Sequence, residues 1–98
     1  MESRLNKTVH DFGVCKEKTN YNAFFKNLSY IAIHRIQPDC NCTVPNLQEP
    51  VFTVKLKTPE FPFQIKGDMA LITKLLEVVW MDGHKEVITI SAQLNRPK

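Results

Sequence analysis

The stretch MALITKLLEVVWMDGHKEVITISAQL, residues 69 to 94, decides the fold class of this chain. Its second half, Val87 to Leu94, alternates apolar and polar side chains with a period of two, which is typical of a half-buried strand. Asp82-Gly83 just before it is a strong hairpin-turn signal. Residues 69 to 81 allow a helix, which Asp68 would cap, or a strand. The strand is the simpler interpretation, because a strand arriving at this turn completes a hairpin.

The rest of the chain also favours sheet. Val, Ile, Thr and the aromatic residues are abundant, and these residues suit pleated surfaces. The predicted strands are residues 5 to 14, 19 to 26, 30 to 36 and 51 to 57, together with the hairpin. We expect residues 37 to 50 to form a loop because they contain three prolines, and residues 59 to 63 to form another. About seven short, closely spaced strands predict an all-β chain folded as a single β-sandwich, with one domain over residues 1 to 98.

Size and charge narrow the class of protein. The chain has 98 residues, of which 43% are apolar and 23% charged, with a formal net charge of +3, values that suit one small globular domain. Residues 1 to 7 are polar and lack the apolar stretch of a signal peptide. The apolar run from Met69 to Met81 is too short to span a bilayer. We therefore expect no membrane association, and a location in the cytoplasm or in a virion.

Two motifs, read in order, resemble a known family. Phe12-Gly13 and Phe25-Lys26-Asn27 are followed by Ile33, Ile36 and the run from Cys40 to Pro45. This order is similar to the Phe-Gly, Phe-Lys-Asn and Cys-Gly-Cys-Thr-x-Pro pattern of a bacterial family of unknown function, built on an immunoglobulin-like domain of the hydin (ASH) type. The resemblance implies an immunoglobulin-like, non-catalytic module.

The cysteines are the sharpest local feature. Cys40 and Cys42, with His34 or Cys15, are weak candidates for a site that holds Cu(I) or Zn. One Cys-x-Cys pair falls short of the four ligands of a structural zinc site, so we expect no metal and no cofactor. The alternative is that both cysteines are small buried residues of a loop. An odd cysteine count without a leader favours reduced thiols; a bond between Cys40 and Cys42 is expected to be strained, and a bridge from Cys15 to either stays open.

Other chemistries find little support. There is no nucleophile-elbow motif and no glycine-rich phosphate loop, so we expect no enzyme and no small-molecule substrate. Six lysines could form a basic face for nucleic acid, with Tyr21 and Phe24 as stacking partners, but strand lysines usually protect sheet edges and no nucleic-acid motif accompanies them. We therefore expect no nucleic-acid partner. These lysines are Lys16, Lys18, Lys26, Lys55, Lys57 and Lys66.

The exposed aromatic residues predict contact with other proteins. Phe61 and Phe63 are held by flanking prolines and suit docking, together with Phe24 and Tyr30; the alternative for the two loop residues is that they tuck under the sandwich rim. The expected partners are other subunits of an assembly. Small immunoglobulin-like proteins without a leader are similar to modules that tailed phages display, which predicts a virion structural or decoration protein. The alternative function is thiol or metal binding by Cys40 and Cys42.

Overall fold

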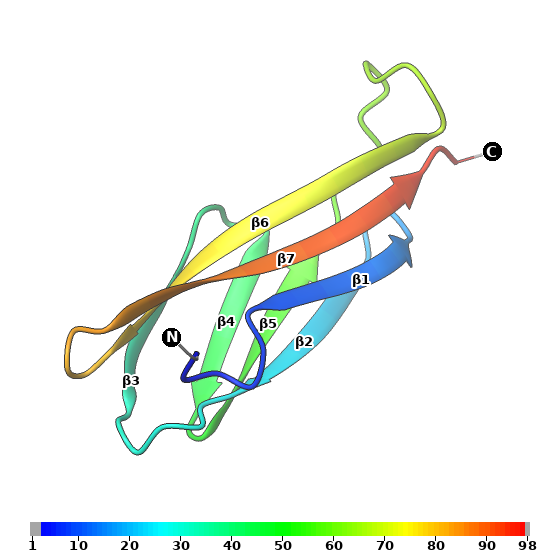
Figure 1. Ribbon diagram of the computed structural model, residues 1–98. Coiled ribbons are helices and arrows are strands. Elements are labelled where there is room, and N and C mark those ends of the chain that lie inside the picture. The colour runs from blue at the N-terminus through cyan, green and yellow to red at the C-terminus, as the bar shows by residue number, and fades with distance from the viewer. Residues whose placement is uncertain (1–2, 98) are drawn as a thin grey trace.

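The computed structural model describes residues 3–97 and folds them into two packed β-sheets (Figure 1). One sheet has the strand order β1-β7-β6-β3 and the other the order β2-β5-β4. Strand β1 runs parallel to β7, and all other neighbouring pairs are antiparallel. This topology confirms the predicted all-β, immunoglobulin-like sandwich of seven strands. The strands are β1 (Val9–Cys15), β2 (Asn20–Lys26), β3 (Ile33–Pro38), β4 (Thr43–Gln48), β5 (Val51–Lys57), β6 (Met69–Trp80) and β7 (Lys85–Asn95).

The hairpin of β6 and β7 is the longest pairing in the molecule. It runs in continuous register from Met69 opposite Asn95 to Val79 opposite Lys85, and Gly83 sits in its turn with a φ of 89°. The strand interpretation of residues 69–80 is therefore confirmed, and the described part of the chain contains no helix. None of residues 3–97 belongs to a helix long and apolar enough to cross a membrane.

The core lies between the two sheets and follows the predicted alternation. Every second residue of β5, and of β7 from Ile88 onward, points inward and is buried. The rings of Phe25 and Phe52, on paired strands, stack with their centroids 5.0 Å apart, and Trp80 is fully covered. Removing this much apolar surface from water is the main stabilising contribution to the fold. The largest buried side chains are Trp80, Phe25, Phe52, Phe61, Leu56, Leu76, Ile88, Ile90 and Leu94.

Strand β4 corrects the predicted loop over residues 37–50. Residues Thr43–Gln48 pair with β5 along their whole length, although Pro45 lies in the middle. A proline has no N–H to donate, but β4 is the edge strand of its sheet and has a free side toward which the proline nitrogen can point. Thr43 is buried and Pro45 and Leu47 half-buried, so the segment has the alternation of a strand.

Two strand boundaries also differ from prediction. Strand β1 begins at Val9 because the preceding segment crosses between the sheets: Leu5 bridges to Asn27 beside β2, whereas Val9 already pairs with β7. Gly13, with a φ of 72°, lies in an irregular stretch of β1, and its amide donates to the Asp11 carboxylate at 2.8 Å. Strand β3 begins at Ile33 and ends at Pro38, later at both ends than predicted.

The loops gather at two ends of the sandwich. The end that contains residues 3–8, 27–32, 49–50 and 81–84 is called the hairpin end below. The opposite end, which contains residues 16–19, 39–42, 58–68 and 96–97, is called the groove end. In Figure 1 the β6–β7 turn marks the hairpin end and the long loop before β6 marks the groove end.

A buried amide organises the hairpin end. The Asn27 Oδ1 accepts from the Trp80 indole at 3.2 Å and from the backbone and hydroxyl of Ser29 at 3.1 and 2.9 Å. Its Nδ2 donates to the Ile31 carbonyl at 2.8 Å and to the Glu49 carboxylate at 3.3 Å. This one side chain therefore satisfies polar groups from three segments that the sequence separates, as buried polar groups require.

The N-terminal segment is joined to the β6–β7 turn by charges. The Arg4 guanidinium donates to both carboxylate oxygens of Asp82 at 3.0 and 2.9 Å and lowers the pKa of Asp82 to about 2. Burial by itself would raise the pKa of Glu86, but hydrogen bonds from Ser3, from the Arg4 amide and from His84 bring it below its usual value. Both carboxylates are therefore held in their ionised form.

Candidate functional site: the disulfide groove

The lengths of β3 and β6 leave an opening in the side of the sandwich at the groove end. β3 pairs with β6 only from Trp80 to Leu76, so the first half of β6 has no strand beside it on that edge. The chain instead leaves the sheet after Pro38 and crosses to β4. The space beside β6 forms a groove of about 470 Å³, which we call the disulfide groove; its lining residues are Cys40, Cys42, Leu56, Lys57, Pro59, Leu71, Ile72, Thr73 and Lys74.

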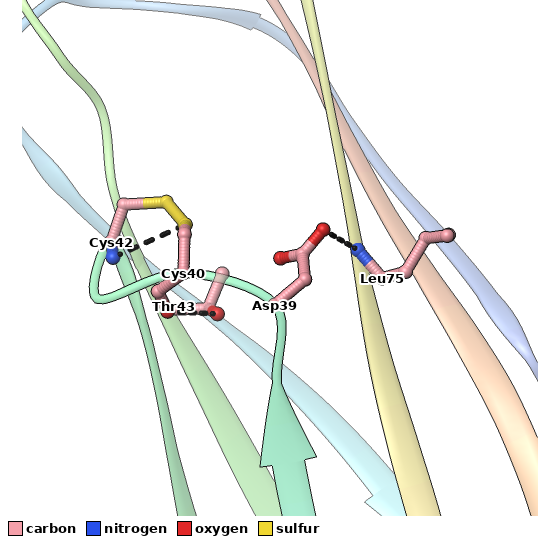
Figure 2. The surroundings of a disulfide bond; sticks show 5 residues. All are labelled: Asp39, Cys40, Cys42, Thr43 and Leu75. Atoms are coloured by element: carbon pink, nitrogen blue, oxygen red, sulfur yellow. Dashed lines mark hydrogen bonds between the residues drawn. A yellow bond between two sulfur atoms is a disulfide. The ribbon is translucent and has the colours of Figure 1, made fainter.

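The crossing segment is a four-residue strap closed by a disulfide. Cys40 and Cys42 are bonded to each other and are both half-buried (Figure 2). The Cys42 amide lies 3.3 Å from the Cys40 Sγ, and the Thr43 hydroxyl lies 3.5 Å from the Cys40 carbonyl oxygen. The bond thus encloses one residue, Asn41, which is exposed.

Backbone hydrogen bonds attach the strap to both sheets. On the four-stranded side, the Asp39 amide donates to the Leu75 carbonyl at 3.1 Å. The Asp39 carboxylate accepts from the Leu75 amide at 3.2 Å, the bond that Figure 2 shows. On the three-stranded side, the Lys57 amide donates to the Cys42 carbonyl at 2.8 Å. The strap is therefore a covalently closed link between the edges of the two sheets.

This bond overturns the expectation of reduced thiols. That expectation came from the odd cysteine count and the polar N-terminus, neither of which reports the local backbone path that brings Cys40 and Cys42 together with their Cα atoms 5.5 Å apart. Cys15 is the free cysteine; it is buried at the end of β1, and burial raises the pKa of its thiol. It bridges to neither of the other two.

The predicted metal candidates are not assembled. His34 is exposed on β3, Cys15 is buried on β1, and the remaining two sulfurs are bonded to each other. Within residues 3–97 no group of three or more His, Cys, Asp or Glu side chains is placed to hold a metal ion.

Lys74 is the unusual side chain of the groove. It belongs to the inward-facing set of β6, between Ile72 and Leu76, and is half-buried where an apolar residue would be expected. None of the acidic side chains in the described range forms an ion pair with it. The groove therefore contains a half-buried lysine with no ion-pair partner among the described carboxylates, which is a feature suited to an anionic ligand.

The two aromatic residues of the loop before β6 have opposite placements. Phe61 is 1% exposed and belongs to the core, so it follows the alternative of tucking under the rim and is not accessible for docking. Phe63 is 57% exposed. The Arg96 guanidinium lies over both rings, 4.8 Å from the centroid of Phe61 and 5.8 Å from that of Phe63, and donates to the Ile65 and Gly67 carbonyls. Arg96 thus fastens this loop to the end of β7.

The four predicted interface residues do not share one surface. Phe24 is exposed on the outer face of the three-stranded sheet, and Tyr30 is exposed in a loop of the hairpin end. Phe63 lies at the groove end. Tyr21, considered as a stacking partner for nucleic acid, instead belongs to the inward set of β2, where its hydroxyl accepts from the Lys16 amide. The six lysines are all exposed but are divided between β2, β5 and the loops of the groove end.

The outer face of the four-stranded sheet carries an apolar surface that sequence reasoning missed. Six large apolar side chains on β1, β6 and β7 point away from the core, with exposed fractions from 46% for Leu75 to 73% for Leu71. We call this set the apolar face; it consists of Val9, Val14, Met69, Leu71, Leu75 and Val87. The signal was the two-sided apolar character of residues 69–80, in which Leu71 and Leu75 interleave with Ile72 and Leu76. A strand with only one buried face would show polar residues there.

Comparisons with models of protein families, with curated proteins and with solved structures found no match for this chain. The resemblance to the immunoglobulin-like family of the hydin (ASH) type therefore stays a prediction.

Proposed function

We propose that this protein is a non-enzymatic immunoglobulin-like module that joins a larger assembly through the apolar face. The observation that carries the proposal is the concentration of six exposed apolar side chains on one sheet. Scattered exposed apolar residues are normal, but their concentration on one face of a monomer is a frequent mark of a protein-interaction site. A chain of 98 residues also has limited buried surface and gains stability when a neighbour covers more of it.

Register across the sheet supports treating these residues as one surface. Val9 lies opposite Thr89 on β7, and Thr89 lies opposite Leu75 on β6, so these three side chains form a row across three strands. A second row contains Val14, Gln93 and Leu71. Each row has apolar side chains at both sides of a polar one, which allows apolar contact at several points while hydrogen-bonding groups remain within reach.

The assembly that we propose is a virion of the tailed-phage type, in which the chain is a structural or decoration subunit. The support is the small size of the chain, its resemblance to immunoglobulin-like modules, and the apolar face. In this setting the partners are other protein subunits, the module needs no cofactor, and the candidate binding residues are those of the apolar face, with Phe24, Tyr30 and Phe63 as smaller separate contacts.

The test is particle association. Virus particles purified on a density gradient from a lysate of the encoding culture should contain the chain in fixed proportion to the major subunits. Replacing Val9, Leu71 and Val87 by Thr, which keeps strand propensity, should lower the amount in particles at least tenfold. The matched control replaces Val44 and Val51 by Thr on the opposite sheet and should leave incorporation unchanged. Absence of the wild-type chain from particles would reject the virion setting, and equal loss in both variants would reject the apolar face.

A further inference from the structure

We propose that the Cys40–Cys42 disulfide is an exchange site for small anionic thiols, which bind in the disulfide groove beside Lys74 and reversibly reduce the bond. The proposal does not rest on the assembly role, because it is argued from the disulfide and Lys74, neither of which belongs to the apolar face. Leu71 is the residue that the groove and the apolar face share.

The first argument is that the disulfide contributes little to the stability of the fold. It joins residues only two apart in sequence. On the chain-entropy account, a disulfide that closes three residues restrains the unfolded chain about half as much as one that closes a 15-residue loop. The strap is already fastened by backbone hydrogen bonds to Leu75 and Lys57, so the sheets stay linked when the bond is broken. The fold therefore tolerates a change in the oxidation state of this pair.

Access is the second argument. Both sulfur-bearing residues are half-buried and line a groove that is open to solvent, so an attacking thiolate can approach them. Cys15, by contrast, is buried at the end of β1 and lines no part of this groove. Exchange is accordingly confined to the pair in the strap.

The third argument is the charge of the groove. Lys74 lies on the inward side of β6 and lines the same groove as the disulfide, and none of the described carboxylates forms an ion pair with it. A half-buried cation interacts with an anion more strongly than an exposed one, because the local dielectric is lower. A small thiol that carries a carboxylate or sulfonate would therefore concentrate beside the bond.

The geometry also selects which sulfur is attacked. The Cys42 amide points at the Cys40 Sγ from 3.3 Å, and such a donor stabilises negative charge on that sulfur. Cys40 is thus the better leaving group. A thiolate attacks the Cys42 Sγ, forms a mixed disulfide with it and releases Cys40 as a thiolate, which takes a proton from water. A second small thiol then attacks the mixed disulfide, so that two small thiols become one small disulfide and the protein gains two thiols.

The experiment compares thiols that differ in charge. Oxidised protein is incubated with 2-mercaptoethanesulfonate, which is anionic, or with cysteamine, which is cationic; the reaction is stopped by alkylation and followed by mass spectrometry. Rates are expressed per thiolate, so that differences in thiol pKa do not enter. We expect the anionic thiol to react about fivefold faster in low salt, the factor that one nearby charge supplies, and the difference to shrink in 1 M salt. Fragment ions of the trapped intermediate should place the adduct on Cys42.

Two variants of equal charge complete the test. Lys74→Gln should lower the preference for the anionic thiol to the part that exposed Lys57 supplies at the groove. Lys55→Gln, on the outer face of β5 in the opposite sheet and outside the groove, should retain the full preference. Equal loss in both variants would show a net-charge effect and overturn the proposal. It is also overturned if the two thiols react equally with the wild-type protein, if the adduct forms on Cys40, or if the pair stays reduced in an oxidising thiol–disulfide buffer.

Discussion

The two ends of the sandwich are closed by different physical means. At the hairpin end, the buried amide of Asn27 accepts hydrogen bonds from Trp80 and Ser29 and donates to Ile31 and Glu49. At the groove end, an aromatic side chain covers the core and a short strap spans the sheet edges. A hydrogen-bond network tolerates little change, because every partner that loses its bond is left unsatisfied. An apolar cover and a strap can leave part of the opening free. The contrast places structural constraint at one end and the candidate chemistry at the other.

The largest loss of stability is expected when the aromatic ring that covers the core at the groove end is removed. Phe61→Ala should lower the free energy of unfolding by about 3–4 kcal/mol, because it deletes a fully buried ring from a packed core. Phe63→Ala, two residues away in the same loop, is the matched control and should cost less than about 1 kcal/mol, since Phe63 is largely exposed. Urea unfolding of both variants measures the difference. Similar losses would mean that the loop and not the buried ring closes this end.

The next largest effect is expected at the hairpin end. Asn27→Ala should destabilise the fold by about 2–3 kcal/mol, because the buried Trp80 indole N–H loses its acceptor and the Glu49 carboxylate loses a donor. Asn22→Ala, at an exposed asparagine of the preceding strand β2, should change stability by less than about 0.5 kcal/mol. Chemical denaturation with tryptophan fluorescence follows both changes. A loss as small as that of the control would show that the network is not a structural constraint.

Breaking the strap should have a smaller effect than either of these. Replacing Cys40 and Cys42 by Ser should lower the free energy of unfolding by about 1.5 kcal/mol, the chain-entropy value for so short a ring. The hydrogen bonds from the Leu75 amide to the Asp39 carboxylate and from the Lys57 amide to the Cys42 carbonyl should persist, which amide hydrogen exchange at Leu75 and Lys57 reports. A loss above about 3 kcal/mol, or rapid exchange at both amides, would show that the fold requires the disulfide. The groove end would then be as structurally constrained as the hairpin end.

The smallest effect is expected in the dependence of stability on acidic pH. The Arg4 guanidinium holds the pKa of Asp82 at about 2 in the folded chain, below the ordinary value of 3.8. Its contribution is therefore complete above pH ~4 and is lost as the pH falls through about 2. In Asp82→Asn, the melting temperature should lie slightly below that of the wild type at pH 5, and the two values should converge near pH 2. A constant offset over that range would assign the effect to packing and not to ionisation.

Local patterns in the sequence were sufficient for most of the strands. The period-two alternation of residues 51–57 and 87–94 identifies both the strands and their inward faces, because the pleat places every second side chain on one side. Strand β4 escaped prediction because Pro45 argues against a strand unless its edge position is known. Edge position is a property of the whole sheet and cannot be derived from the local segment.

The candidate site depends on relationships between distant segments. The disulfide groove exists because β6 continues past the point where β3 ends, which only the tertiary pairing reveals. From the sequence alone, Lys74 is an ordinary polar residue in a segment that could be a helix or a strand. Its inward position follows from the register of β6 with β7. The Cys-x-Cys pair itself was visible, but its oxidation state was not, since composition does not report the path of the backbone through the strap.

The parallel pairing of β1 with β7 has a mechanical consequence. The N-terminal segment lies at the hairpin end and Arg96 at the groove end, on a molecule 48 Å long (Figure 1). Tension applied between residues 3 and 97 therefore pulls β1 and β7 in opposite directions along their shared axis. Their hydrogen bonds are loaded together in shear and do not open one after another, as they would in a hairpin pulled apart from its open end. Single-molecule stretching between these points should give a higher rupture force than pulling the β6–β7 hairpin apart from its open end.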